Sequence, residues 1–182
     1  MSIEDRSLDA LKEGGTATVI DRSDYGWNTR KHKLYSMNDT GSAPDHYLHV
    51  DSDGFLKANG GVNSDNIFTV YTQTVGSKVV VMLEHDSTKK VVAISTNSDE
   101  VCAKTLPVGT TLSQFNNLSK AKASEPNILF HKKPRTPGSE HFHLQSYLDA
   151  QKRVGFDPNG IPMPPSKVNL QHPASLFKMY TS

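Results

Sequence analysis

Three histidines in the C-terminal half are the residues whose types and spacing come closest to a metal site. His141 and His143 are separated by one residue, which places both imidazoles on the same face of a strand, and His131 precedes them. Zinc takes three or four protein ligands, and neither a Cys pair nor a suitably spaced carboxylate accompanies these histidines. Solvated strand histidines are the preferred interpretation, and no metal or other cofactor is expected.

The thiol of Cys102 is the second candidate for chemistry. It is the only cysteine, so an intramolecular disulfide is impossible. A nucleophilic thiol needs a base and an oxyanion donor beside it, whereas Cys102 lies in an alternating segment between Val101 and Ala103. We predict a small, buried or half-buried thiol. Because the sequence contains no phosphate loop, serine elbow or paired-carboxylate motif, no enzymatic activity is expected.

Two acidic segments and one basic segment have the composition of turns. Asp51-Ser52-Asp53-Gly54 has the opening spacing of a calcium loop, but Val62 stands where the twelfth-position acid is required. Asp157-Pro158-Asn159-Gly160 also has turn chemistry. We interpret both as hairpin turns.

The basic segment contains Lys132, Lys133 and Arg135. A sulfated sugar could bind these cations, although three charges on a turn more often form a solvated surface, which is the favoured interpretation. The whole chain has 20 Lys+Arg and 19 Asp+Glu, a formal charge of +1. That balance lacks the basic field of a nucleic-acid binder, so nucleic acid is not an expected partner.

The elements that must position these residues are short strands. Nearly every apolar run from position 32 onward is bounded by Gly, Pro, Asn, Asp or Ser, which predicts one all-β domain of about twelve strands. The expected strands are 33–37, 46–50, 55–58, 67–72, 78–83, 91–95, 101–104, 128–131, 141–145, 153–156, 161–163 and 176–180.

Three of the expected hairpins resemble one another. Segments 47–56, 91–101 and 153–161 each read as strand, polar turn, strand. A threefold repeat of a four-strand unit closes the barrel of a β-trefoil and caps it, which leaves no free sheet edge. The second interval is longer because Pro107 to Pro126 inserts a polar loop, which we predict to be an exposed contact surface.

The N-terminal residues are expected to form a separate segment. Residues 2–13 have the pattern of one short amphipathic helix, and 16–31 are polar. We therefore divide the chain into an N-terminal pro-segment, 1–24, and a β-trefoil domain, 25–182. The first fifteen residues contain no apolar signal region, and the chain contains no apolar run of about 20 residues, so cytosolic synthesis without membrane insertion is expected.

Scattered positions give the sequence a family resemblance. The segments 127–130, 142–147, 154–156 and 176–179, with 47–63 earlier in the chain, are spaced in a way that resembles the interleukin-1 superfamily of cytokines. The resemblance implies a monomeric β-trefoil that acts by binding the ectodomain of an immunoglobulin-like receptor. The resemblance implies no catalytic residues in this chain.

A second likeness lies at the junction of the two segments. Ser23-Asp24-Tyr25-Gly26 is similar to the site at which a caspase cuts interleukin-18 precursors, which implies cleavage between Asp24 and Tyr25. Asp21, three positions earlier, is more typical of an executioner-caspase site. The same likeness implies a cytoplasmic precursor that is secreted without a signal peptide.

Cleavage there would change the charge of the chain. The product would carry 17 Lys+Arg and 13 Asp+Glu, a formal charge of +4. Trp and Arg are common in binding hot spots, so we expect Trp27, Arg30, Lys31 and Lys33 to join the receptor contact. The alternative is that Trp27 plugs the base of the barrel and the cations are only solvated.

Two other trefoil classes are alternatives. Residues 153–162 resemble a late hairpin of the fibroblast growth factors, which bind a receptor kinase and heparan sulfate. Against them stand the near-neutral charge, the longer inserted loop and the missing secretory signal. A carbohydrate-binding trefoil would repeat a Gln-x-Trp motif, whereas this chain has one tryptophan.

Overall fold

The computed structural model describes residues 26–39, 44–63, 65–169 and 173–181. The strands are β1 (Asn28–Ser36), β2 (Tyr47–Val50), β3 (Leu56–Gly60), β4 (Phe68–Val75), β5 (Lys78–His85), β6 (Val91–Ile94), β7 (Val101–Lys104), β8 (Phe130–Pro134), β9 (His141–Ser146) and β10 (Phe177–Thr181). The helical segments are η2 (Leu112–Gln114), α1 (Leu118–Ser124), η3 (Pro126–Ile128), η4 (Pro165–Lys167) and η5 (Pro173–Ser175). None of the described helices is long and apolar enough to cross a membrane.

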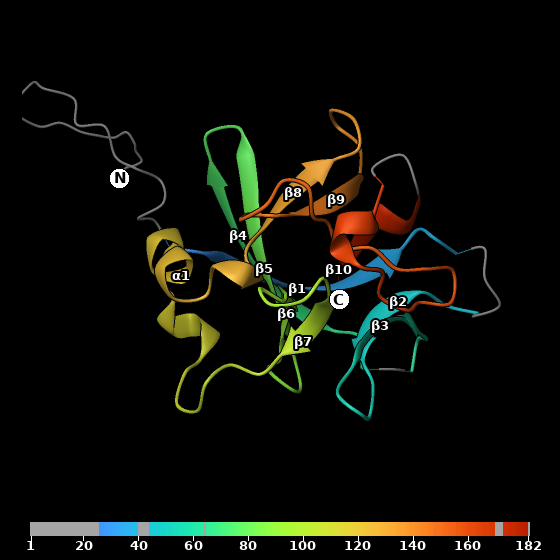
Figure 1. Ribbon diagram of the computed structural model, residues 1–182, viewed down its shortest axis with the longest axis horizontal. Helices are drawn as coiled ribbons and strands as arrows, with labels where there is room; N and C mark the ends of the chain where they lie inside the picture. The colour runs from blue at the N-terminus through green and yellow to red at the C-terminus, as the bar shows by residue number, and fades with distance from the viewer. Residues whose placement is uncertain (1–25, 40–43, 64, 170–172, 182) are drawn as a thin grey trace, which may run out of the picture.

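Six strands close into a barrel (Figure 1). β1 pairs with β4, β4 with β5, β5 with β8, β8 with β9, β9 with β10, and β10 returns to β1, always antiparallel. Closure gives each of these strands a hydrogen-bonded neighbour on both sides. The predicted all-β class is confirmed.

Alternating side chains of the barrel strands fill its interior. The two side chains that flank Tyr35 in β1, Leu34 and Ser36, are buried, as the period of two in a strand requires. The ring of Phe156 meets that of Phe177 edge-on, with centroids 6.0 Å apart. Each fully buried phenylalanine contributes about 2 to 3 kcal/mol of hydrophobic stabilisation. The largest fully buried side chains include Phe68, Phe130, Phe156, Phe177, Leu34, Leu48, Leu56, Met82 and Leu83.

Three hairpin-like excursions leave the barrel, after β1, after β5 and after β9. The first is β2–β3, the second is β6–β7, and the third is a pair of isolated bridges. Their turns are built alike, because the backbone N–H of the first turn residue donates to a carbonyl four or five residues later. These pairs are Asp51–Phe55, Ser95–Glu100 and Asp157–Ile161, each at 2.9 Å.

The side chain of the first turn residue completes each turn. Its oxygen accepts the N–H two positions later, at distances between 2.8 and 3.3 Å. These pairs are Asp51 with Asp53, Ser95 with Asn97, and Asp157 with Asn159. The two acidic segments are therefore hairpin turns, as predicted, and the Oδ1 atoms of Asp51 and Asp157 accept hydrogen bonds within the turns themselves.

Two of the predicted strands are reduced to bridges. Segment 153–156 contributes the bridge between Gln145 and Arg153, and segment 161–163 contributes the bridge between Phe156 and Pro162. Proline has no N–H to donate to a ladder, and Pro164 follows closely, so regular pairing cannot continue there. The strand predicted at 33–37 begins earlier, at Asn28, because 28–32 pairs with β4 although its side chains are mostly exposed.

The segment from Pro107 to Pro126 is not an irregular loop, so that part of the prediction is wrong, although most of its residues are exposed, as predicted. It contains η2 and α1, and Leu112, Phe115 and Leu118 are buried. These side chains belong to a second apolar cluster, with Val80 and Met82 of β5 among its members. The segment covers part of the outer side of the barrel (Figure 1), and we term it the lid. The predicted helix at 2–13 and the whole of the predicted pro-segment, 1–24, lie outside the described residues.

Candidate functional site

Trp27, the first predicted contact residue, is half-buried. Its Nε1 donates a hydrogen bond of 2.8 Å to the carbonyl oxygen of Phe115, and its ring packs against the second apolar cluster. The barrel interior is a different cluster that does not include Trp27. Trp27 therefore does not plug the barrel base, but fastens the chain before β1 to the lid.

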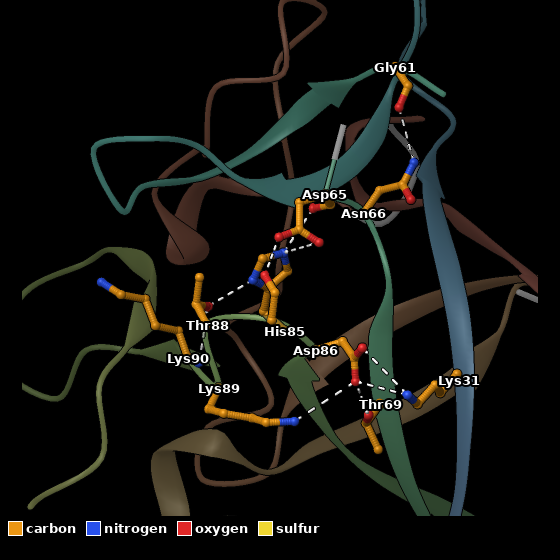
Figure 2. Close-up of polar contacts among 11 residues, drawn as sticks. Lys31, Gly61, Asp65, Asn66, Thr69, His85, Asp86, Thr88, Lys89 and Lys90 are labelled. Atoms are coloured by element: carbon orange, nitrogen blue, oxygen red, sulfur yellow. Dashed lines mark hydrogen bonds and ion pairs between the residues drawn. The ribbon is translucent and has the colours of Figure 1, made fainter. Parts of the chain in front are cut away.

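Lys31 and Lys33 project from β1 toward different partners. Figure 2 shows Lys31 and Lys89 converging on the carboxylate of Asp86, with Lys31 Nζ 3.3 Å and Lys89 Nζ 3.9 Å from Oδ1. The hydrogen bond from Lys31, followed by Coulombic attraction to both lysines, holds the pKa of Asp86 below its usual value. Arg30, which precedes Lys31 in β1, is exposed, so the predicted cations do not converge on one point.

Asp86 is positioned by a buried histidine that sequence reasoning did not single out. His85 lies at the end of β5, with Nδ1 2.7 Å from Thr88 Oγ1 and Nε2 2.8 Å from the carbonyl oxygen of Asp65 (Figure 2). Its ring also meets that of Phe68 edge-on at 5.3 Å. With both nitrogens engaged, His85 fixes the turn that presents Asp86 to β1.

Three tyrosines, from β1, β2 and β10, lie close together on the outer side of the barrel. The ring of Tyr35 in β1 lies 5.1 Å from that of Tyr47 in β2 and 6.5 Å from that of Tyr180 in β10, both edge-to-face. Lys33 Nζ lies 5.9 Å from the centre of the Tyr47 ring, and Lys178 Nζ lies 5.0 Å from that of Tyr180. We term these five residues the tyrosine face.

The tyrosine face suits protein recognition. Tyrosine supplies a large amphipathic contact area with few rotatable bonds, and its hydroxyl remains able to hydrogen-bond. Burial, and then the nearby carboxylates of Asp39 and Asp45, raise the pKa of Tyr35, so its hydroxyl stays protonated as a donor. Tyr180 is exposed, with 39% of its surface accessible. Lys33 is the predicted contact residue that belongs to this face.

No family model matches this chain, and no curated protein matches it. The candidate site therefore rests on its own geometry. The predicted processing residues Asp21, Asp24 and Tyr25 lie outside the described residues.

The histidines considered as metal ligands engage different partners. His143 Nδ1 lies 2.9 Å from Ser175 Oγ, while the ring of His131 packs against that of Tyr147 at 4.9 Å. Within the described ranges, no group of three or more His, Cys, Asp or Glu side chains is arranged to hold a metal. Cys102 is half-buried in β7, as predicted, and burial raises the pKa of its thiol.

A hollow of about 390 Å³ lies between the outer side of β4–β5 and residues 105–113. Its lining includes Tyr71 and Glu84, whose Oη and Oε1 are 3.3 Å apart. Burial raises the pKa of Tyr71 to about 12 and also raises that of Glu84. The pair is a polar contact under the lid, in which the tyrosine donates to the carboxylate.

Replacing Glu84 with glutamine is expected to stabilise the fold at pH 7. A carboxyl group whose pKa is higher in the folded state binds its proton more strongly there. Its contribution to stability therefore falls as the pH rises from the unfolded-state pKa, near 4.5, through the folded-state pKa. Glutamine removes the buried charge and can still accept the Tyr71 hydrogen bond. Thermal unfolding should show a gain at pH 7 that shrinks at pH 4, whereas a loss at pH 7 would contradict the assignment.

Proposed function

We propose that this chain is a β-trefoil cytokine of the interleukin-1 superfamily, most like interleukin-18, that signals by binding an immunoglobulin-like receptor. The observation that carries the proposal is the order in which barrel strands and hairpins follow one another along the chain. A barrel strand, a hairpin and a second barrel strand follow one another three times: β1 to β4, β5 to β8, and β9 to β10 with the two bridges between them. A β-trefoil is built from three such units, so this order supports the proposal.

The position of β1 supports activation by a cut after Asp24. The first barrel strand begins at Asn28, and Trp27 is anchored to Phe115, so removal of residues 1–24 spares both. The new N-terminus at Tyr25 would lie two residues before Trp27, on the same segment as Arg30 and Lys31. In this proposal the precursor is cytoplasmic, and the cut domain, 25–182, is secreted without a signal peptide.

The tyrosine face is the receptor contact in this proposal. It combines three tyrosine rings, a residue type enriched at protein interfaces, with two lysines that give it positive charge. Lys33 links it along β1 to Lys31 and Arg30. A partner of complementary acidic character could thus extend from the tyrosine face toward the new N-terminus.

The proposal is tested by caspase digestion of the purified full-length chain. We expect one cut, read as a new N-terminal Tyr25 by mass spectrometry, followed by stronger binding to interleukin-receptor ectodomains. Asp24→Glu keeps the charge but removes the residue that caspases require, so it should abolish both effects. Asp39→Glu, the same change within the domain, is the matched control and should behave like the parent chain.

Two results would count against the proposal. Receptor binding that is equal before and after the cut would contradict the proposal that the full-length chain is an inactive precursor. Binding to a receptor kinase instead of an interleukin receptor would favour the growth-factor-like alternative.

A further inference from the structure

A line of three adjoining hollows follows β8, β9 and the start of β5. The largest, about 580 Å³, is lined in part by Lys78, Lys132 and Lys133. The next, about 410 Å³, shares Lys133 and adds Arg135, while the third, about 400 Å³, shares Lys78. We term the three hollows the basic groove. β8 and β9 are labelled in Figure 1.

Strand register explains why the cations gather there. His131 of β8 faces Gln145 of β9, and Lys133 faces His143 in the same ladder. His131 is also the partner of Val80 in β5, two residues after Lys78. Alternate residues of a strand share one face, so Lys78, His131 and Lys133 lie on the same outer side of the barrel.

Among the described residues, the cations of the basic groove form no ion pair with a carboxylate. Across the described part of the chain, ion pairs with acidic side chains are formed by Lys31, Lys57, Lys89, Lys104 and Lys178, and none is found for the groove cations. Burial, and then repulsion from Lys78 and Lys133, lower the pKa of His131. An anion entering the groove would therefore meet cations that no described carboxylate pairs with.

We propose that the basic groove binds a linear sulfated glycan, with Lys78, Lys133 and Arg135 each facing a separate anionic group. The cations are distributed over adjoining hollows, which suits a chain with spaced charges better than one small anion. The Gln145 amide lines two of the hollows; its Nε2 donates to the Ala150 carbonyl oxygen at 2.9 Å, and a primary amide has a second N–H and an oxygen that suit sugar hydroxyls.

A single-stranded nucleic acid fits less well. Such ligands stack bases on aromatic side chains. The aromatic ring lining the groove, that of Tyr147, is already packed against His131 and has Lys122 Nζ 5.6 Å from its centre. This inference is independent of the receptor and the protease in the proposed function.

The test measures binding of the full-length chain to immobilised heparin, with a heparin dodecasaccharide as competitor. Lys78→Gln combined with Lys133→Gln should weaken binding at least about tenfold and lower the salt concentration needed for elution. The control, Lys89→Gln with Lys167→Gln, removes the same charge from residues outside the groove lining. It should change affinity by less than about twofold. Thermal melts of both variants should match the parent chain.

Three outcomes would overturn the proposal. Equal affinity of the groove and control variants would place any binding elsewhere. Equal binding of desulfated heparin would show that the sulfates are not recognised. Tighter binding of single-stranded DNA of matched charge, lost in the groove variant, would assign the groove to nucleic acid. None of these measurements uses a receptor or a caspase, so failure here leaves the proposed function standing.

Discussion

Replacing Gly160 with alanine is expected to lower the free energy of unfolding by about 3 kcal/mol. Gly160 has φ +81°, a conformation that L-residues rarely adopt, and a Cβ there would lie 2.5 Å from the carbonyl carbon of Ala58. Because that neighbour is backbone, it cannot rotate away as a side chain could. The third hairpin would have to move off β3.

That movement would break a contact between two of the three hairpins. The Ala58 N–H donates to the Gly160 carbonyl at 2.8 Å, a backbone hydrogen bond between residues 102 positions apart. Gly138→Ala is the matched control, since Gly138 has the same φ of +81° but nothing within 4 Å of the added Cβ. Gly138→Ala should lower the free energy of unfolding by about 1 kcal/mol, because it introduces backbone strain without a close contact. Urea denaturation measures both, and equal losses would mean that the close approach to Ala58 contributes nothing.

The parts of the fold that sequence reasoning predicted are those fixed by local chemistry. The turns at Asp51 and Asp157 were predictable because an acidic side chain, followed three residues later by glycine, supplies both the acceptor and the positive φ. The strands between the turns follow from short apolar runs. Neither inference depends on distant residues.

Sequence reasoning failed where a distant contact determines the structure. The first half of β1 is polar, and it is a strand because β4 supplies its hydrogen-bond partners. The lid between Pro107 and Pro126 was predicted as a polar loop from its Ser, Asn and Lys content, although Leu112, Phe115 and Leu118 recur at every third position, a spacing typical of a helical face. One signal for the lid is present in β5, where residues 79–83 are all apolar and thus need cover on both faces.

The candidate site was only partly predictable for the same reason. Lys33 was selected as a cation near the new N-terminus, but its aromatic neighbours come from β2 and β10. Tyr47 and Tyr180 are more than 130 residues apart in sequence, and only barrel closure through the β1–β10 pairing brings them together. The spacing of tyrosines along the chain contains no sign of that closure.

Replacing Trp27 with alanine is expected to lower the free energy of unfolding by about 2 kcal/mol. The indole covers part of the second apolar cluster, and its Nε1 hydrogen bond satisfies the Phe115 carbonyl. Trp27→Phe keeps most of the apolar contact and should cost only about 1 kcal/mol, the value of one hydrogen bond. Arg30→Ala, in the same strand region but exposed, should leave stability nearly unchanged.

These three variants separate the two roles considered for Trp27. If the indole only fastens β1 to the lid, Trp27→Phe will bind receptor as the parent chain does, and only Arg30→Ala will weaken binding. If Trp27 is itself a contact, Trp27→Phe will lose receptor affinity by more than its small stability change can explain, since a protein that remains folded loses affinity only through the interface. The half-buried position of the ring, with its N–H already donated to Phe115, favours the first result. Receptor recognition would then depend on the tyrosine face and the cations of β1, with Trp27 keeping that strand in place after the cut.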